Sequence, residues 1–358
     1  MFKNKSISLF ALLALVMLGA FPLTTFAAKN ADAVRVTLDF GQTAFASDES
    51  VPVNVSIRNE GKTAVRILRW LTPIDGVKDD LFAVTIDGRR VEYIGADYKR
   101  AAPTDKDYVT LEAGATLETT IDLAGYYDLS QTGFYQVSYE AKSIDGYPTE
   151  IMPRAGAEEN QALRSETAQA WISGRETLVP FEPMMDAVSG STSFTGCSTS
   201  RQSSLVTARN NASTYSANSY NYLAAGTVGA RYTTWFGSYT SSRYSTVRSH
   251  YSNIRNAMDT ASVRFNCTCT DSAYAYVYPT QPYTIYLCNA FWNAPSTGTD
   301  SKAGTLVHEM SHFNVVAGTD DWAYGQSAAK SLARSNPTRA VDNADSHEYF
   351  AENTPAQQ

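Results

Sequence analysis

Residues 304–313 read GTLVHEMSHF, and this stretch decides how the C-terminal half of the chain is interpreted. We predict that it lies in a helix over residues 299–316. On a helix His308 and His312 share a face, because they are four residues apart. Their ring nitrogens would converge on one point about 2 Å away, which suits Zn²⁺. The chain has four histidines and two of them stand in this His-Glu-x-x-His motif, which favours a zinc site over an accidental match.

Glu309 lies next to the first of these histidines, where it can reach a metal-bound water rather than the metal. We expect it to act as general base and then general acid, passing the proton of that water to a leaving amine. Asp300 or Ser301 is the expected N-cap of the helix. The apolar neighbours that would bury the helix beside the metal are Leu306, Val307, Met310 and Phe313.

A catalytic zinc site needs a third protein ligand and keeps its fourth position for water. A pattern with a third histidine six residues after the second is excluded, because Val315 and Gly318 stand where it needs Gly and His. A carboxylate much further along, Glu348 or Glu352, is conceivable. The nearer candidate is GTDDWAYG at residues 318–325, where a glycine turn can bring an aspartate back under the metal.

The motif HEMSH followed by GTDDWAYG resembles the aspzincin metallopeptidases, the family of deuterolysin and peptidyl-Lys endopeptidases. The resemblance covers residues 196–358 and implies an α+β, zincin-like catalytic domain that holds one Zn²⁺ per chain. It implies Asp321 as the third ligand, with the adjacent Asp320 as the lesser candidate. It also implies that Tyr324 donates a hydrogen bond to the developing oxyanion, whose charge appears only in the transition state.

Asp345 and Glu348 are three residues apart and would share one face of a short helix. Two carboxylates in a narrow pocket favour a compact ammonium on a long stem. In the Lys-specific members of the family, an Asp and a Glu with this spacing line the pocket for the residue after the scissile bond. The resemblance therefore implies cleavage on the amino side of Lys. The alternative is that Asp345 only caps the helix that holds Glu348.

Four further ionisable residues receive no role in the chemistry. Asp342 and Glu352 are expected to be solvated surface groups. His347 faces elsewhere on the same helix, so we expect it to be structural or exposed. His250 lies on a predicted helix without a partner motif and is expected to be non-catalytic.

The N-terminus predicts a secretory signal over residues 1–27. Lys3 and Lys5 precede an apolar run at residues 9–21, and Thr25-Phe-Ala27 offers small residues at a cleavage site. An anchoring membrane helix is the alternative, but the run is shorter than the roughly 20 residues that a span needs. We therefore expect a secreted protein with no membrane attachment after signal cleavage.

The four cysteines all lie after residue 196, in a chain expected to be exported. They could be metal ligands, but exported context and the lack of paired Cys-x-x-Cys spacing argue for disulfides. The resemblance implies the pairs Cys197–Cys267 and Cys269–Cys288.

Residues 28–172 have the pattern of an all-β region. Apolar and polar residues alternate over residues 34–40 and 51–57, and turn signals separate the short strands, which suggests an immunoglobulin-like sandwich. Residues 173–195 predict a linker or processing region, in which Arg175 is one candidate cleavage site. The catalytic domain then spans residues 196–358. There we expect helices over 203–224 and 242–260, and strands over 263–269 and 274–287.

Two interpretations compete for the β region. It can be a propeptide that assists folding and blocks the active site of an inactive proenzyme, or a permanent module that binds carbohydrate or a cell surface. We favour the propeptide, because it explains the Gly- and Pro-containing stretch before Cys197 and protects the producing cell.

The composition limits the partners. A net charge of −7 disfavours nucleic acid but says little about protein substrates. The expected partners are protein and peptide substrates and the chain's own N-terminal propeptide, and the protein is expected to be a monomer. From Cys197 onward there are two Lys against nine Arg, as expected of an enzyme that avoids presenting its own preferred bond. The alternatives are an aspzincin of broad specificity, or a secreted toxin or binding protein with a structural zinc.

Overall fold

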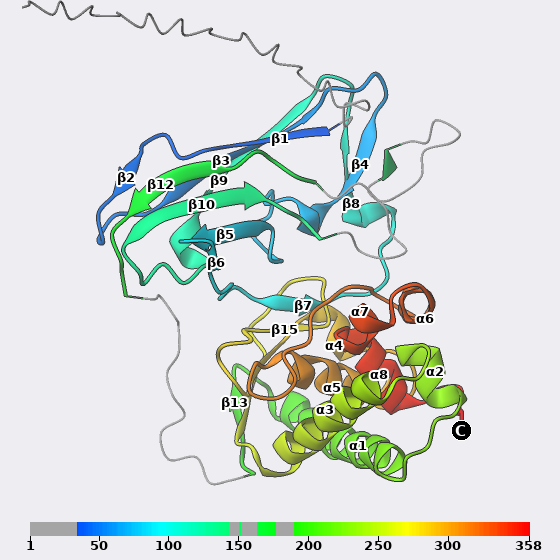
Figure 1. Ribbon diagram of the computed structural model, residues 1–358. Helices are drawn as coiled ribbons and strands as arrows, with labels where there is room; N and C mark the ends of the chain where they lie inside the picture. The colour runs from blue at the N-terminus through cyan, green and yellow to red at the C-terminus, as the bar shows by residue number, and fades with distance from the viewer. Residues whose placement is uncertain (1–33, 143–149, 152–162, 177–189) are drawn as a thin grey trace, which may run out of the picture. The chain divides into compact units, whose positions relative to one another are not determined.

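The computed structural model of the chain describes residues 34–142, 150–151, 163–176 and 190–358 (Figure 1). The predicted signal sequence lies outside the described residues, as does most of the predicted linker. Residues 32–358 form one unit by their internal contacts. Among the residues that are described, no helix combines the length and apolar character that crossing a bilayer requires.

Most strands of the N-terminal region pair within three sheets. In β3 (Pro52–Asn59) the side chains of Val53, Val55 and Ile57 are buried while the residues between them face outward, which is the period of a half-buried strand. The first sheet has the order β1-β3-β9, the second β2-β12-β10-β5-β6 and the third β11-β4-β8. The other strands of these sheets are β1 (Val34–Asp39), β2 (Ala44–Phe45), β4 (Val65–Leu68), β5 (Phe82–Ile86), β6 (Arg89–Arg90), β8 (Tyr108–Leu111), β9 (Thr116–Asp122), β10 (Gly133–Tyr139), β11 (Glu150–Ile151) and β12 (Ala168–Ile172).

The C-terminal half is built from helices around a mixed sheet. Its helices are α1 (Thr199–Ala224), α2 (Ala230–Phe236), α3 (Ser241–Thr260), α4 (Asn289–Asn293), α5 (Lys302–His312), α6 (Gln326–Ser335), α7 (Pro337–Val341) and α8 (Ala344–Glu352). Its strands are β13 (Thr192–Thr195), β14 (Val263–Asn266), β15 (Ala275–Val277) and β16 (Thr284–Leu287). The strand expected over 274–287 is split in two, because Pro279 and Pro282 between its halves cannot donate ladder hydrogen bonds.

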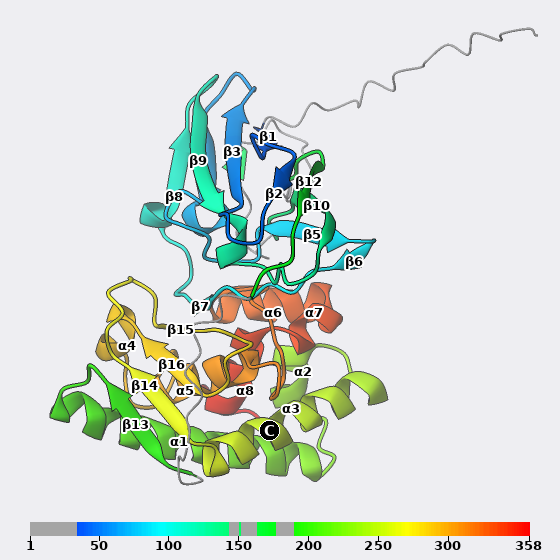
Figure 2. The ribbon, with the colours of Figure 1, turned by 90° about the vertical axis from the view of Figure 1, so that its left-hand side faces the viewer.

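The sheet of the C-terminal half takes strands from two places that the sequence assigns elsewhere. Its order is β13-β14-β16-β15-β7, and β7 (Asp97–Lys99) comes from the middle of the N-terminal region (Figure 2). At the other edge, β13 pairs in parallel with β14. The predicted linker over 173–195 is therefore too long at its C-terminal end, because the last four of its residues belong to this sheet.

Helix α5 is buried along its length and carries the His-Glu-x-x-His motif. Its N-cap is Ser301, whose side chain accepts a hydrogen bond from Gly304 N at 2.9 Å. Ser301 is one of the two residues expected in this position. Glu352 also lies there: its Oε1 accepts hydrogen bonds from the Ser301 backbone N and side chain, both at 2.8 Å. The expectation that Glu352 is solvated is wrong: its side chain is buried, because the unpaired N–H groups at the start of a buried helix need a hydrogen-bond acceptor.

Two disulfides tie the helices to the sheet. Cys197 is bonded to Cys267, and Cys269 to Cys288, which are the pairs that the resemblance implies. The first bond joins the segment before α1 to the end of β14. The second joins the segments on either side of β15 and β16, so both clamp the sheet on which the site is built.

Candidate active site

Two histidines and an aspartate converge beneath helix α5. His308 and His312 lie one turn apart, and their Nε2 atoms are 3.0 Å from each other. Gly318, with φ of 58°, turns the chain after the helix and brings Asp321 back toward them. One Asp321 oxygen lies 3.4 Å from His308 Nε2 and the other 3.6 Å from His312 Nε2. One ion can therefore be reached by all three side chains.

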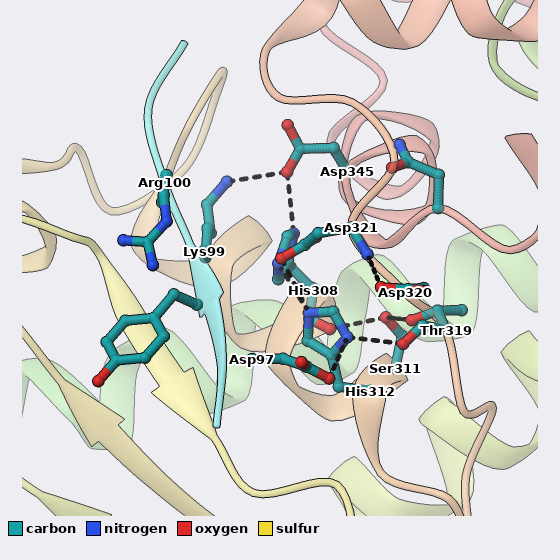
Figure 3. A network of polar contacts seen from close by, with 12 residues as sticks. Asp97, Lys99, Arg100, His308, Ser311, His312, Thr319, Asp320, Asp321 and Asp345 are labelled. Carbon is teal, nitrogen blue, oxygen red and sulfur yellow. Dashed lines mark hydrogen bonds and ion pairs between the residues drawn. The ribbon is translucent and has the colours of Figure 1, made fainter. Parts of the chain in front are cut away.

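The other nitrogen of each imidazole is held by a polar partner (Figure 3). His308 Nδ1 lies 2.9 Å from Asp345 Oδ1, and His312 Nδ1 lies 2.7 Å from the backbone oxygen of Thr319. Both partners are acceptors, so they suit the tautomer in which Nδ1 carries the proton and Nε2 is left as a metal ligand. Burial, followed by the neighbouring His308, lowers the pKa of His312 to about 3, which keeps this ring neutral as a ligand must be.

The donor set fits Zn²⁺. The two Nε2 atoms lie 3.0 Å apart, and Asp321 Oδ1 is buried without a hydrogen-bond partner. Buried polar atoms of this kind are costly unless something binds them, and two imidazoles plus one carboxylate is a ligand set typical of catalytic zinc.

The alternative ligands are directed elsewhere. Asp320 forms an ion pair with Lys142 and accepts a hydrogen bond from Asp321 N at 2.7 Å, so its carboxylate is engaged away from the histidine pair. Glu352 caps α5. Glu348 lies on the Nδ1 side of His308, 3.5 Å from that atom, and not beside the two Nε2 atoms. Asp321 is therefore the carboxylate that the geometry favours.

Glu309 is fully buried beside this centre. Neither of its carboxylate oxygens has a hydrogen-bond partner among the described residues. Burial, followed by the nearby Asp321, raises the pKa of Glu309 well above its usual range. A carboxylate with raised pKa and free oxygens is equipped to accept a proton and give it back.

Tyr324 follows the third ligand by three residues. Its hydroxyl lies 3.1 Å from Asp321 Oδ2 and 3.2 Å from the backbone oxygen of Tyr98 in β7. Burial raises the pKa of Tyr324 well above its usual range, so the hydroxyl stays protonated as a donor. Trp70 packs edge-on against the ring, with centroids 6.1 Å apart, and fixes its direction.

Asp345 and Glu348 form a buried acidic pair on α8. The Lys99 ammonium lies between them, 3.4 Å from Asp345 Oδ1 and paired with Glu348 Oε2, and all three side chains are fully buried. Asp345 is not the N-cap of α8, which is Asn343. Instead its second oxygen accepts a hydrogen bond from Gly325 N at 2.6 Å. Burial acts to raise the pKa of Asp345, but Lys99, His308 and Gly325 N together lower it to about 2.

Lys99 was missed by sequence reasoning, which found no catalytic cluster in the N-terminal region. It is one of six lysines in residues 28–174, and no local pattern separates it from the others. The aromatic rings of Tyr274 and Tyr349 lie 5.0 and 6.0 Å from its ammonium. The predicted lysine pocket could have pointed to this residue. An acidic pair that is expected to bind the lysine of a substrate can also bind a lysine of the same chain.

The two remaining histidines contact each other. His347 is fully buried on α8, and its Nε2 lies 3.0 Å from His250 Nδ1 on α3. His250 thus has a partner that its own sequence neighbourhood does not reveal. Burial lowers the pKa of His250 to about 4 and that of His347 to about 3. Both rings lack contact with the Nε2 pair, which agrees with a structural role.

Known proteins resemble the chain over this site and beyond it. A family model described as lysine-specific metallo-endopeptidase, the aspzincin family, matches residues 221–352. An extracellular protease of Aeromonas hydrophila is 44% identical over 330 residues, which cover 90% of this chain and 92% of the relative. A peptidyl-Lys metalloendopeptidase of Armillaria mellea is 38% identical, covering 98% of this chain and 100% of the relative. The solved structure of a zinc peptidase from Grifola frondosa is 58% identical, covers 45% of this chain and all of its own, and has a TM-score of 0.44.

Proposed function

Because the chain belongs to the aspzincin family of lysine-specific metallo-endopeptidases, we propose that it hydrolyses peptide bonds on the amino side of lysine. The family makes it a zinc metalloendopeptidase acting on proteins or peptides. One observation carries the finer assignment: the buried ammonium of Lys99 lies between Asp345 and Glu348. A closed pocket with two carboxylates suits an ammonium better than the broad, planar guanidinium of arginine.

In this proposal His308, His312 and Asp321 hold zinc. Zinc bound there lowers the pKa of a water molecule and polarises the carbonyl of the substrate. Glu309 accepts the proton of the attacking water and donates it to the leaving nitrogen. Tyr324 donates a hydrogen bond to the carbonyl oxygen as it gains charge. Asp345 and Glu348 bind the lysine that follows the scissile bond.

Two interpretations compete with this proposal. The first is a protein with a structural zinc, and the second is a peptidase of broad specificity. The unpartnered oxygens of Glu309 argue against the first, because a closed structural site has no use for a buried carboxylate beside it. The acidic pair on α8 argues against the second. Both arguments rest on side chains that would cost stability without a ligand.

The test is a digest of peptides that differ at one position, which holds Lys, Arg or norleucine. We expect cleavage before Lys alone, and none when a chelator is present. Equal cleavage of all three peptides would support the broad-specificity alternative. Mass spectrometry of the products identifies the bond.

We also propose that the chain is exported as an inactive proenzyme. The predicted signal sequence and the name of the Aeromonas relative, an extracellular protease, support export. Occupation of the acidic pocket by Lys99 supports inhibition by the N-terminal region. The mass of the secreted form is the check, since a secreted active product near full length would contradict the proenzyme.

A further inference from the structure

Strand β7 binds to the site in the manner of an extended peptide. It pairs antiparallel with β15, with Lys99 opposite Ala275 and Tyr98 opposite Tyr276. Without β7, β15 would be the edge of the sheet, and an extended peptide commonly binds by adding a strand to such an edge. The Lys99 backbone oxygen also accepts a hydrogen bond from Tyr274 N at 2.9 Å. The backbone of β7 is therefore fixed on both sides of Tyr98.

The side chains of β7 alternate between the pocket and the outer face, as a strand requires. Lys99 enters the acidic pocket. Tyr98 points to the other face, where its ring lies 4.8 Å from that of Tyr276, and Arg100 lies over the Tyr98 ring at 4.6 Å. Figure 3 shows Lys99 directed at Asp345 and Arg100 directed away from it. The register thus delivers one lysine to the pocket.

The carbonyl just before Lys99 lies at the catalytic end of the site. The Tyr98 oxygen is 3.2 Å from the hydroxyl of Tyr324, which is itself 3.1 Å from Asp321. One peptide bond therefore meets two requirements of a substrate: its carbonyl contacts the hydrogen-bond donor, and the residue after it fills the acidic pocket.

We propose that the Tyr98–Lys99 bond is a self-cleavage site, which the zinc-loaded chain hydrolyses in its own active site. This inference rests on the proposed cleavage before lysine. One water is consumed: its oxygen bonds to the Tyr98 carbonyl carbon, the C–N bond breaks, and a proton goes to the Lys99 nitrogen. The products end at Tyr98 and begin at Lys99.

The position of this bond explains what the cut achieves. It lies between β6 and β8, outside the strands that pair within the three N-terminal sheets. Those sheets keep their hydrogen bonds after the cut, whereas β7 becomes two chain ends that separate independently. The cut therefore opens the pocket without first unfolding the N-terminal region.

The experiment starts from full-length protein purified with a chelator, and zinc is then added. Intact-mass measurement should show two fragments that meet at Tyr98–Lys99, formed at a rate that does not change on dilution, since bond and site belong to one chain. A Glu309→Gln chain mixed with wild type should stay uncut while the wild type cleaves itself. Early cleavage of the Glu309→Gln chain would overturn cleavage within one chain.

Two lysine variants separate this inference from the proposed function. Lys99→Ala removes the ammonium and should slow this cut by roughly 10⁴-fold, yet should cleave an added Lys peptide because its pocket is vacant. Lys106→Ala is the matched control, because Lys106 is exposed and its loss should leave the cut at the wild-type rate. If Lys99→Ala cleaves the added peptide while wild-type Tyr98–Lys99 stays intact, self-cleavage is wrong and the proposed function stands. If neither is cleaved, the proposed function fails.

Discussion

The two nitrogens of His308 face two different cation sites. On the Nε2 side lie His312 and Asp321, and on the Nδ1 side lie Asp345 and Glu348. Both groups are spaced closely enough for a metal ion, but their chemistry differs. The Nε2 side offers two imidazole nitrogens and an unpartnered carboxylate oxygen, whereas on the Nδ1 side the Lys99 ammonium already lies between the two carboxylates. One imidazole therefore separates the proposed site of chemistry from the proposed site of specificity.

The largest effect should come from breaking the Nε2 side. His312→Ala removes one zinc ligand, so we expect zinc to be lost and activity to fall by more than roughly 10³-fold. Metal analysis after gel filtration, together with a peptide assay, measures both. His250→Asn is the matched control, because it alters a half-buried histidine outside both sites and should retain zinc and activity.

Breaking the Nδ1 side should change specificity first. Glu348→Gln removes a charge that contacts the ammonium, and we expect kcat/KM for Lys peptides to fall by roughly 10²–10³-fold, as for a broken buried ion pair, with zinc retained. Asp345→Asn should add a second loss, because Asp345 also orients His308, and such orienting partners change metal affinity by about 10–100-fold. Equal zinc affinity in the two variants would contradict the division between the two sides.

A substitution at Tyr324 tests the proposed stabilisation of the oxyanion without changing a residue of either cation site. Tyr324→Phe keeps the ring and its packing but removes the donor, so kcat should fall by about 10²–10³-fold while zinc content stays unchanged. Steady-state kinetics on one Lys peptide measures this. A loss confined to KM would assign Tyr324 to substrate binding instead.

The smallest effect should come from a histidine that faces neither cation site. His347 is buried and His250 is half-buried, and burial lowers their pKa values to about 3 and 4. Below about pH 6.5, the usual pKa of histidine, the unfolded chain therefore binds more protons than the folded chain. The two histidines therefore contribute fully to the free energy of unfolding above that pH. Their contribution falls as the pH drops toward 3, by up to about 1.4 kcal/mol per pH unit for each histidine.

Urea unfolding of zinc-free protein at pH 7, 6 and 5 checks this, because the zinc ligands then contribute alike to both proteins. His347→Gln should flatten the slope of stability against pH. An unchanged slope in the variant would show that this pair is protonated in the folded state.

The sequence predicted the site best where the chemistry is local. His308, Glu309 and His312 lie on one helix, so their spacing alone indicates convergence, and the resemblance supplied the disulfide pairs and the residues after the helix. What it missed depends on contacts between distant segments. Lys99 contacts Glu348 across most of the chain, and His250 on α3 contacts His347 on α8. Glu352 is buried because the start of α5, three helices earlier in the chain, needs an acceptor.

The most direct test of the two-sided account is the position of zinc itself. Anomalous diffraction at the zinc edge, from crystals of the zinc-loaded Glu309→Gln protein, locates every bound ion. We predict one peak, at about 2.0–2.2 Å from His308 Nε2, His312 Nε2 and Asp321. A peak at His308 Nδ1 between Asp345 and Glu348 would contradict the account, because zinc would then occupy the pocket proposed for lysine.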